Sequence, residues 1–149
     1  MEARVQELMG KYELAVAFAK EFIAELGEAR TIEILGRAFE KIQIKAGKDL
    51  ATKLGSNSIQ AMAEHSRKTA SEKDNCDVLE VTDRHVKLKI TGCPAHEAFK
   101  RLGAPEICKA YCDSDQVFIK AFNQKMKMIR TKTIAGGDDY CDHIWAMAD

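Results

Sequence analysis

The stretch from Lys125 to Met147 reads KMKMIRTKTIAGGDDYCDHIWAM and predicts two strands joined by a turn. One face of the first strand is expected to carry Met126, Met128, Arg130 and Lys132, which alternate along the chain. Residues 136–139, GGDD, are typical of a turn, because glycine accepts positive φ and aspartate bonds to nearby backbone. From Tyr140 onward the alternation returns, and one face of the last strand takes Cys141, His143, Trp145 and Met147. A thiol and an imidazole on one strand face are either an unusual part of the core or part of a site.

Upstream of this hairpin, the sequence predicts two more strands and two helices. Residues 78–81 suggest a strand, and residues 82–84 a tight turn. In residues 85–90, Val, Leu and Ile alternate with lysine, which is typical of an antiparallel strand with one buried face. Helices are expected over residues 95–102 and over residues 106–122, each after a proline suited to the first helical turn.

The N-terminal half is expected to be helical. Residues 2–26 carry apolar side chains at the spacing of an amphipathic helix, and Gly27 ends that pattern. A second helix is expected over residues 29–54, and Ser58 should cap a third that runs to about Thr69. The apolar area of the two long helices is large for one small sheet to cover. They are therefore either scaffold or the surface of a homodimer.

These elements predict one α+β domain spanning residues 1–149. The N-terminal helices of residues 1–70 pack on an antiparallel sheet of about four strands, formed with two crossing helices by residues 76–149. A chain of 149 residues is long enough to bury a core of this kind.

Composition narrows the classes of function. The 23 basic residues balance the 23 acidic ones, so nothing global indicates binding to nucleic acid or to an anionic membrane. No apolar run reaches the length of a membrane-spanning helix, and the first residues do not resemble a signal peptide. The five cysteines form no CxxC pair, and we interpret them as reduced thiols of a cytoplasmic protein.

Cys93 is the strongest candidate for a reactive thiol. It precedes Pro94 at the expected start of a helix, where free N–H groups and the positive end of the helix dipole lower a thiol pKa. His96 lies in the same first turn, close enough to meet the thiol or a ligand. The alternative is a small residue at a tight strand-to-helix junction.

Residues 130–142, RTKTIAGGDDYCD, resemble the C-terminal signature of the L-2-amino-thiazoline-4-carboxylic acid hydrolase family, (K/R)T-x-(A)-x-GDD-x-CDF. Cys93-Pro94 and Cys112-Asp113 also agree with that family, so the resemblance covers residues 84–145. More distantly, the region is similar to the 4-vinyl reductase type of ligand-binding domain. His143 stands where both patterns have phenylalanine.

The resemblance implies hydrolysis of a small cyclic amidine or thiazoline carboxylate to N-carbamoyl-cysteine. Catalysis would then involve Cys93, Cys112, Cys141 and Asp139, with Cys93 or Cys112 as nucleophile or thiol partner and Asp139 as proton acceptor. Substrate binding would involve Arg130, Lys132, His96 and His143, with Arg130 or Lys132 on the carboxylate.

No cofactor is required by the sequence. Cys93, Cys112 and Cys141 together would be a possible zinc site. Some members of the 4-vinyl reductase type bind zinc near this strand pair, but the expected glutamate and cysteine are Arg130 and Thr133 here.

The distant resemblance favours a second hypothesis, a non-catalytic module that binds or senses a small molecule between helices and sheet. A purely structural helical dimer is a third, and it would leave the Cys, Asp and His residues of the C-terminal half without a role.

Overall fold

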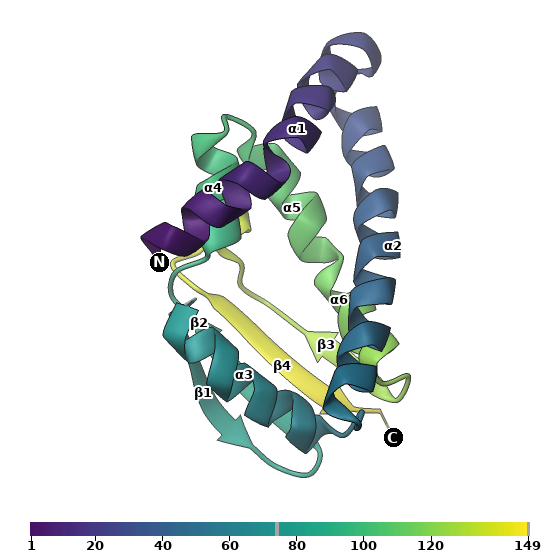
Figure 1. Ribbon diagram of the computed structural model, residues 1–149, viewed down its shortest axis with the longest axis vertical. Coiled ribbons are helices and arrows are strands. Elements are labelled where there is room, and N and C mark those ends of the chain that lie inside the picture. Colours follow the sequence, from purple (N-terminus) through teal and green to yellow (C-terminus); the bar gives the residue numbers. More distant parts are fainter. Residues whose placement is uncertain (74, 149) are drawn as a thin grey trace.

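Two long helices, joined at Gly27, organise the N-terminal half of the protein. The computed structural model describes residues 1–73 and 75–148. Helix α1 (Glu2–Leu26) runs outward and α2 (Glu28–Leu54) returns, so their shared end forms a tip that projects beyond the remaining elements (Figure 1). Gly27 has φ 80°, a conformation that suits glycine and permits the abrupt reversal.

Four strands form an antiparallel sheet with the order β1-β2-β4-β3: β1 (Cys76–Val81), β2 (His85–Ile90), β3 (Met126–Ile129) and β4 (Cys141–Met147). In the β2–β4 register, Leu88 lies opposite His143 and Val86 opposite Trp145. These four side chains are buried and therefore form the inner face of the sheet. The α+β fold and the antiparallel sheet expected from the sequence are confirmed.

The helices divide the core into two clusters. Helix α3 (Ile59–Lys73), α6 (Asp115–Phe122) and the end of α2 pack on the sheet. Helices α4 (Pro94–Arg101) and α5 (Pro105–Asp113) pack with α1 at the other end of the molecule (Figure 1). Phe39 brings α2 into this second cluster, so α2 connects both parts of the core.

The start of α3 agrees with the cap that the sequence predicted. Ser58 Oγ accepts a hydrogen bond from the Ala61 N–H at 3.1 Å, which is the cap expected at the start of α3. In the part of the chain that is described, no helix is both long and apolar enough to cross a bilayer.

Two predictions about element boundaries were wrong. The helix expected over residues 106–122 is two helices, because the chain changes direction at Ser114, whose hydroxyl donates to the Tyr111 carbonyl at 2.6 Å. Strand β3 ends at Ile129, so Arg130 and Lys132 do not continue its face. The link to β4 contains a short 3₁₀ helix, η1 (Ile134–Gly136), and Gly137 after it has φ 99°, the positive φ that the glycine pair suggested.

Close packing of α2 on α6 predicts that Gly47→Ala destabilises the protein. A Cβ at position 47 would lie 2.5 Å from the Phe118 carbonyl oxygen and 3.0 Å from the Phe122 nitrogen, and both belong to backbone. We expect the free energy of unfolding in urea to fall by about 1–3 kcal/mol.

Gly36→Ala is the matched control in the same helix, because no atom lies within 4 Å of its added Cβ. It should be neutral or stabilising by up to about 1 kcal/mol. Equal effects of the two substitutions would contradict this packing.

Candidate functional site

A surface pocket of about 340 Å³ opens where α4 begins beside the loop that precedes β4. Its lining is formed by Met1, Thr91, Gly92, Cys93, His96, Glu97, Arg101, Ile134 and Asp139. Three residues that the sequence singled out therefore share one pocket: Cys93 and His96 from the start of α4, and Asp139 from the distant GGDD segment. We refer to this as the Cys93 pocket.

Cys93 caps α4, as expected, but its pKa moves in the opposite direction from the one predicted. Its Sγ accepts a hydrogen bond from the His96 N–H at 3.4 Å. Burial raises the pKa of the thiol to about 12, which outweighs the lowering by that N–H, and the nearby Cys112 and Cys141 raise it further. The thiol is therefore protonated at neutral pH, and an attack by its sulfur would first need a base.

The polar groups of the Cys93 pocket include both a guanidinium and carboxylates. Arg101 Nε donates to Glu97 at 2.7 Å, and its two terminal nitrogens donate to Glu2 at 2.7 and 3.1 Å. These bonds hold the pKa of Glu97 below its usual value. Nδ1 of His96 is buried and has no hydrogen-bond partner among the described residues. The pocket thus contains a cation able to bind a carboxylate and an imidazole with an unused nitrogen.

The other two predicted catalytic thiols are buried behind this pocket. Cys112 Sγ lies 3.7 Å from Cys108 Sγ on α5, and this contact, together with burial, raises the pKa of Cys112. Cys141 Sγ accepts from the Ile134 N–H at 3.2 Å and so holds η1 against the start of β4. Burial raises the pKa of Cys141 as well.

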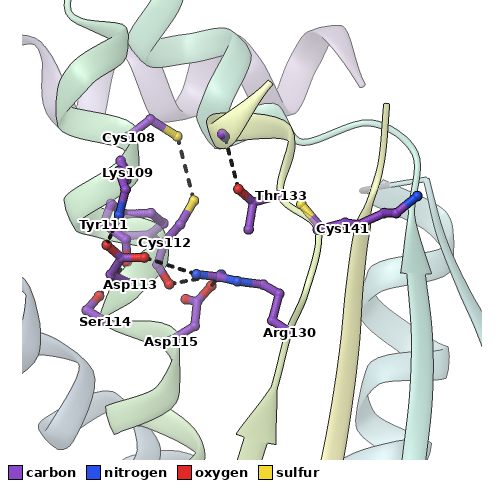
Figure 2. A network of polar contacts seen from close by, with 12 residues as sticks. Cys108, Lys109, Tyr111, Cys112, Asp113, Ser114, Asp115, Arg130, Thr133 and Cys141 are labelled. Carbon is purple, nitrogen blue, oxygen red and sulfur yellow. Dashed lines mark hydrogen bonds and ion pairs between the residues drawn. The ribbon is translucent and has the colours of Figure 1, made fainter. Parts of the chain in front are cut away.

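Arg130 is engaged by protein groups at the junction of α5 and α6 (Figure 2). Its guanidinium donates to the Cys112 carbonyl and to Asp113 Oδ1, both at 3.1 Å, and lies 3.6 Å from Asp115. Burial raises the pKa of Asp115 to about 7, although Arg130 lowers it. The side chain of Arg130 is only 8% exposed, so its surroundings differ from the open strand face that the sequence suggested.

Lys132 also lies outside the Cys93 pocket. Its Nζ sits 4.7 Å from the centre of the Tyr140 ring on the exposed surface. Asp142 accepts bonds from the backbone N–H groups of Thr131 and Lys132, which fixes the start of the loop. Within residues 1–73 and 75–148, no three His, Cys, Asp or Glu side chains converge to hold a metal ion. Zinc bound by Cys93, Cys112 and Cys141 stays a prediction.

His143 lines a second pocket of about 260 Å³ between the sheet and the helices α2, α3 and α6, which we refer to as the Trp145 pocket. The walls are mostly apolar, and they include Trp145, whose Nε1 is buried with no partner among the described residues. Burial, and then Arg130, lower the pKa of His143 to about 4. The imidazole is therefore neutral at pH 7.

The sequence did not single out Glu97 and Arg101 as pocket residues. They are four residues apart on a helix, and such a pair is usually a solvated ion pair. His65 and Ser66, which line the Trp145 pocket, were also missed because the apolar stripe of α3 gave no reason to select them.

The sequence model of the L-2-amino-thiazoline-4-carboxylic acid hydrolase family matches residues 7–145. The chain belongs to this family. The match includes the helical half, beyond residues 84–145 on which the resemblance rested. No curated protein gives a significant match to this family member.

Two solved structures share the fold of this hydrolase-family chain at low sequence identity. The phenol-responsive sensory domain of the transcription activator PoxR, crystallised with phenol, has a TM-score of 0.59 and 15% identity, and the likeness covers 91% of this chain and 73% of that one. A trafficking protein particle complex subunit 3 from Naegleria fowleri, covalently bound to palmitic acid, has a TM-score of 0.58 and 13% identity over 100% and 98% of the two chains.

The neutral, buried His143 predicts a specific pH dependence of stability. Its pKa is about 4 when folded and about 6.5 when unfolded, so its contribution is complete above pH 6.5 and is lost as the pH falls toward 4. Between pH 7 and pH 5 this loss should be about 2 kcal/mol.

His143→Phe restores the aromatic residue of the family pattern. This substitution should remove the loss of stability between pH 7 and pH 5 that protonation of His143 causes. Urea unfolding at pH 7 and pH 5 measures it in both proteins. A parallel loss of stability in the variant and the wild type would show that His143 is not the titrating group.

Proposed function

We propose that this protein hydrolyses a small cyclic amidine or thiazoline carboxylate in the Cys93 pocket. Family membership supports the reaction class, and one observation supports the location. The pocket brings Asp139 of the GGDD segment together with Cys93 and His96 from the start of α4, beside the guanidinium of Arg101. A pocket of this size is ample for a substrate with about ten non-hydrogen atoms.

Electrostatics favours water over the thiol as the attacking group. The thiol of Cys93 is protonated at neutral pH, whereas Asp139 is an exposed carboxylate on the pocket wall. In the proposed reaction, the water oxygen adds to the C=N carbon, and one water proton passes through Asp139 to the ring nitrogen. The carbon–sulfur bond breaks as the carbonyl forms, and the second proton reaches the departing sulfur, carried by His96.

The substrate carboxylate is assigned to Arg101. Its guanidinium already binds the carboxylates of Glu2 and Glu97 at the edge of the pocket, so a substrate carboxylate would replace one of them. Arg130 and Lys132, the cations expected from the sequence, lie outside the pocket lining. In this proposal Cys112 and Cys141 support the pocket from behind and do not touch the substrate.

The test is turnover of L-2-amino-thiazoline-4-carboxylate by purified, reduced protein, with N-carbamoyl-cysteine followed by mass spectrometry. Asp139→Asn should lower kcat/KM by about 100-fold or more, because the base is lost. Asp138→Asn is the matched control: Asp138 accepts from the Thr133 N–H, an asparagine oxygen can do the same, and the side chain lies outside the pocket lining. It should stay within a few-fold of wild type.

Cys93→Ser separates the two mechanisms. Addition of water predicts turnover within about tenfold of wild type, whereas attack by the thiol predicts a loss of several orders of magnitude. Repeating the assay with a chelator tests the zinc prediction separately. Absence of product under every condition would remove the hydrolase proposal.

A second function is favoured by the unpaired indole N–H of Trp145 in the Trp145 pocket. An unsatisfied buried donor is costly, so a ligand that supplies an acceptor would be bound there in preference to a purely apolar one. The two solved structures of similar fold hold phenol and palmitic acid. A cavity of about 260 Å³ suits a molecule of the size of phenol.

Phenol is therefore the probe, and the shift in Tm is the measurement. Phenol should raise the Tm of the wild type in a concentration-dependent way, and Trp145→Phe should remove most of the rise, because the pocket keeps an aromatic wall but loses the donor. Stabilisation that is equal in both proteins would exclude Trp145 as the binding group.

A further inference from the structure

An exposed ridge of large apolar side chains lies on the part of α1 that leads to the projecting tip. Leu14, Phe18, Phe22 and Leu26 repeat every four residues, and each is between 44 and 67% exposed. A neighbouring stripe of the same helix buries Val5, Leu8, Tyr12, Val16 and Ala19 against the core. The ridge therefore belongs to a second face of α1, which the described residues leave in solvent.

The size of the ridge separates it from scattered surface hydrophobic residues. Four such side chains, each about half exposed, present roughly 400 Å² of mostly apolar surface, within the range of functional patches on soluble proteins. Nothing in the proposed function uses this surface, because both cavities lie elsewhere in the molecule.

We infer that the ridge is the contact surface of a homodimer, in which α1 of one copy packs antiparallel on α1 of a second copy. This inference rests on the order of the four side chains along the ridge. Read in either direction the ridge is Leu, Phe, Phe, Leu at constant spacing. A two-fold axis near residue 20 therefore places Leu14 against Leu26 of the partner and Phe18 against Phe22 of the partner.

This arrangement agrees with the way helices pack. Side chains four residues apart form one ridge, and two such ridges interdigitate at a crossing angle near −50°. A two-fold contact must also be self-complementary, so that each pair occurs twice. Exposed Ala15 lies next to the ridge and leaves space for the larger side chains of the second copy.

Charges along the ridge are complementary under the same axis. Lys11 lies on this face toward one end of the ridge, and Glu25 lies at the other end. Antiparallel packing brings Lys11 of each copy within about one helical turn of the partner subunit's Glu25. A parallel arrangement would instead place the like charges together.

The area indicates a dimer of moderate affinity. A stable interface removes about 800 Å² from each partner, and the ridge supplies roughly half of that. The flanking side chains of α1 and of the first turns of α2 supply the remainder, because both helices form the tip (Figure 1). We therefore expect dissociation in the micromolar range.

Sedimentation velocity of the full chain from about 1 to 200 µM tests the inference. The wild type should change from monomer to dimer across this range, and Phe18→Glu/Phe22→Glu should remain a monomer. Because both phenylalanines are exposed, the variant should keep the wild-type circular dichroism spectrum and Tm. Leu79→Glu is the control, since Leu79 is an exposed leucine of similar accessibility on β1, and it should dimerise like the wild type.

A charge exchange tests the antiparallel geometry. Lys11→Glu should weaken the dimer by several-fold, and Lys11→Glu combined with Glu25→Lys should restore it. A wild type that is monomeric at 200 µM would overturn the inference, and so would a dimer that survives Phe18→Glu/Phe22→Glu. A dimer that is lost with the ridge but insensitive to the charge exchange would overturn the antiparallel arrangement.

Discussion

The ion pairs of Arg130 join the segment that follows β3 to the junction of α5 and α6. The guanidinium is almost fully buried, and a buried cation is tolerated only where protein groups replace water. Its partners, the Cys112 carbonyl, Asp113 and Asp115, lie at the break between α5 and α6, whereas Arg130 itself follows β3 (Figure 2). This contact fixes where the strand ends and the loop toward β4 begins. That loop carries Asp139 to the wall of the Cys93 pocket, so the geometry of the candidate site depends on Arg130.

The two pockets differ in chemistry because the side chains that line them differ in polarity. The Cys93 pocket opens at the surface, and its walls carry carboxylates, a guanidinium and an imidazole, which suit acid–base chemistry on a polar substrate. The Trp145 pocket is mostly apolar, with a neutral imidazole and an unpaired indole N–H, which suit binding of a small, mostly apolar molecule that carries an acceptor. The proposed hydrolysis and the proposed binding of a small molecule therefore concern two separate places in one fold.

Local patterns in the sequence predicted those parts of the fold that local physics determines. Alternation in β2 and β4 and the caps at Ser58 and Cys93 depend on nearby residues, and the structure confirms them. The turn of Arg130 away from β3 depends on partners distant in sequence, whereas the break at Ser114 involves a bond to nearby Tyr111 that the apolar pattern of the helix did not reveal. The pKa of Cys93 was mispredicted for the same reason, since the helix terminus is visible in the sequence but burial is not. Arg101 was missed because an ion pair on one helix has the same pattern whether or not it borders a pocket.

The most direct measurement of the central claim is a crystal structure of the Asp139→Asn protein with L-2-amino-thiazoline-4-carboxylate bound. The account places the ligand in the Cys93 pocket, with its carboxylate on Arg101, its ring sulfur toward His96 and its C=N carbon facing residue 139. Ligand density in the Trp145 pocket, with the Cys93 pocket empty, would contradict the account. In that case the Trp145 pocket would be the site of the chemistry.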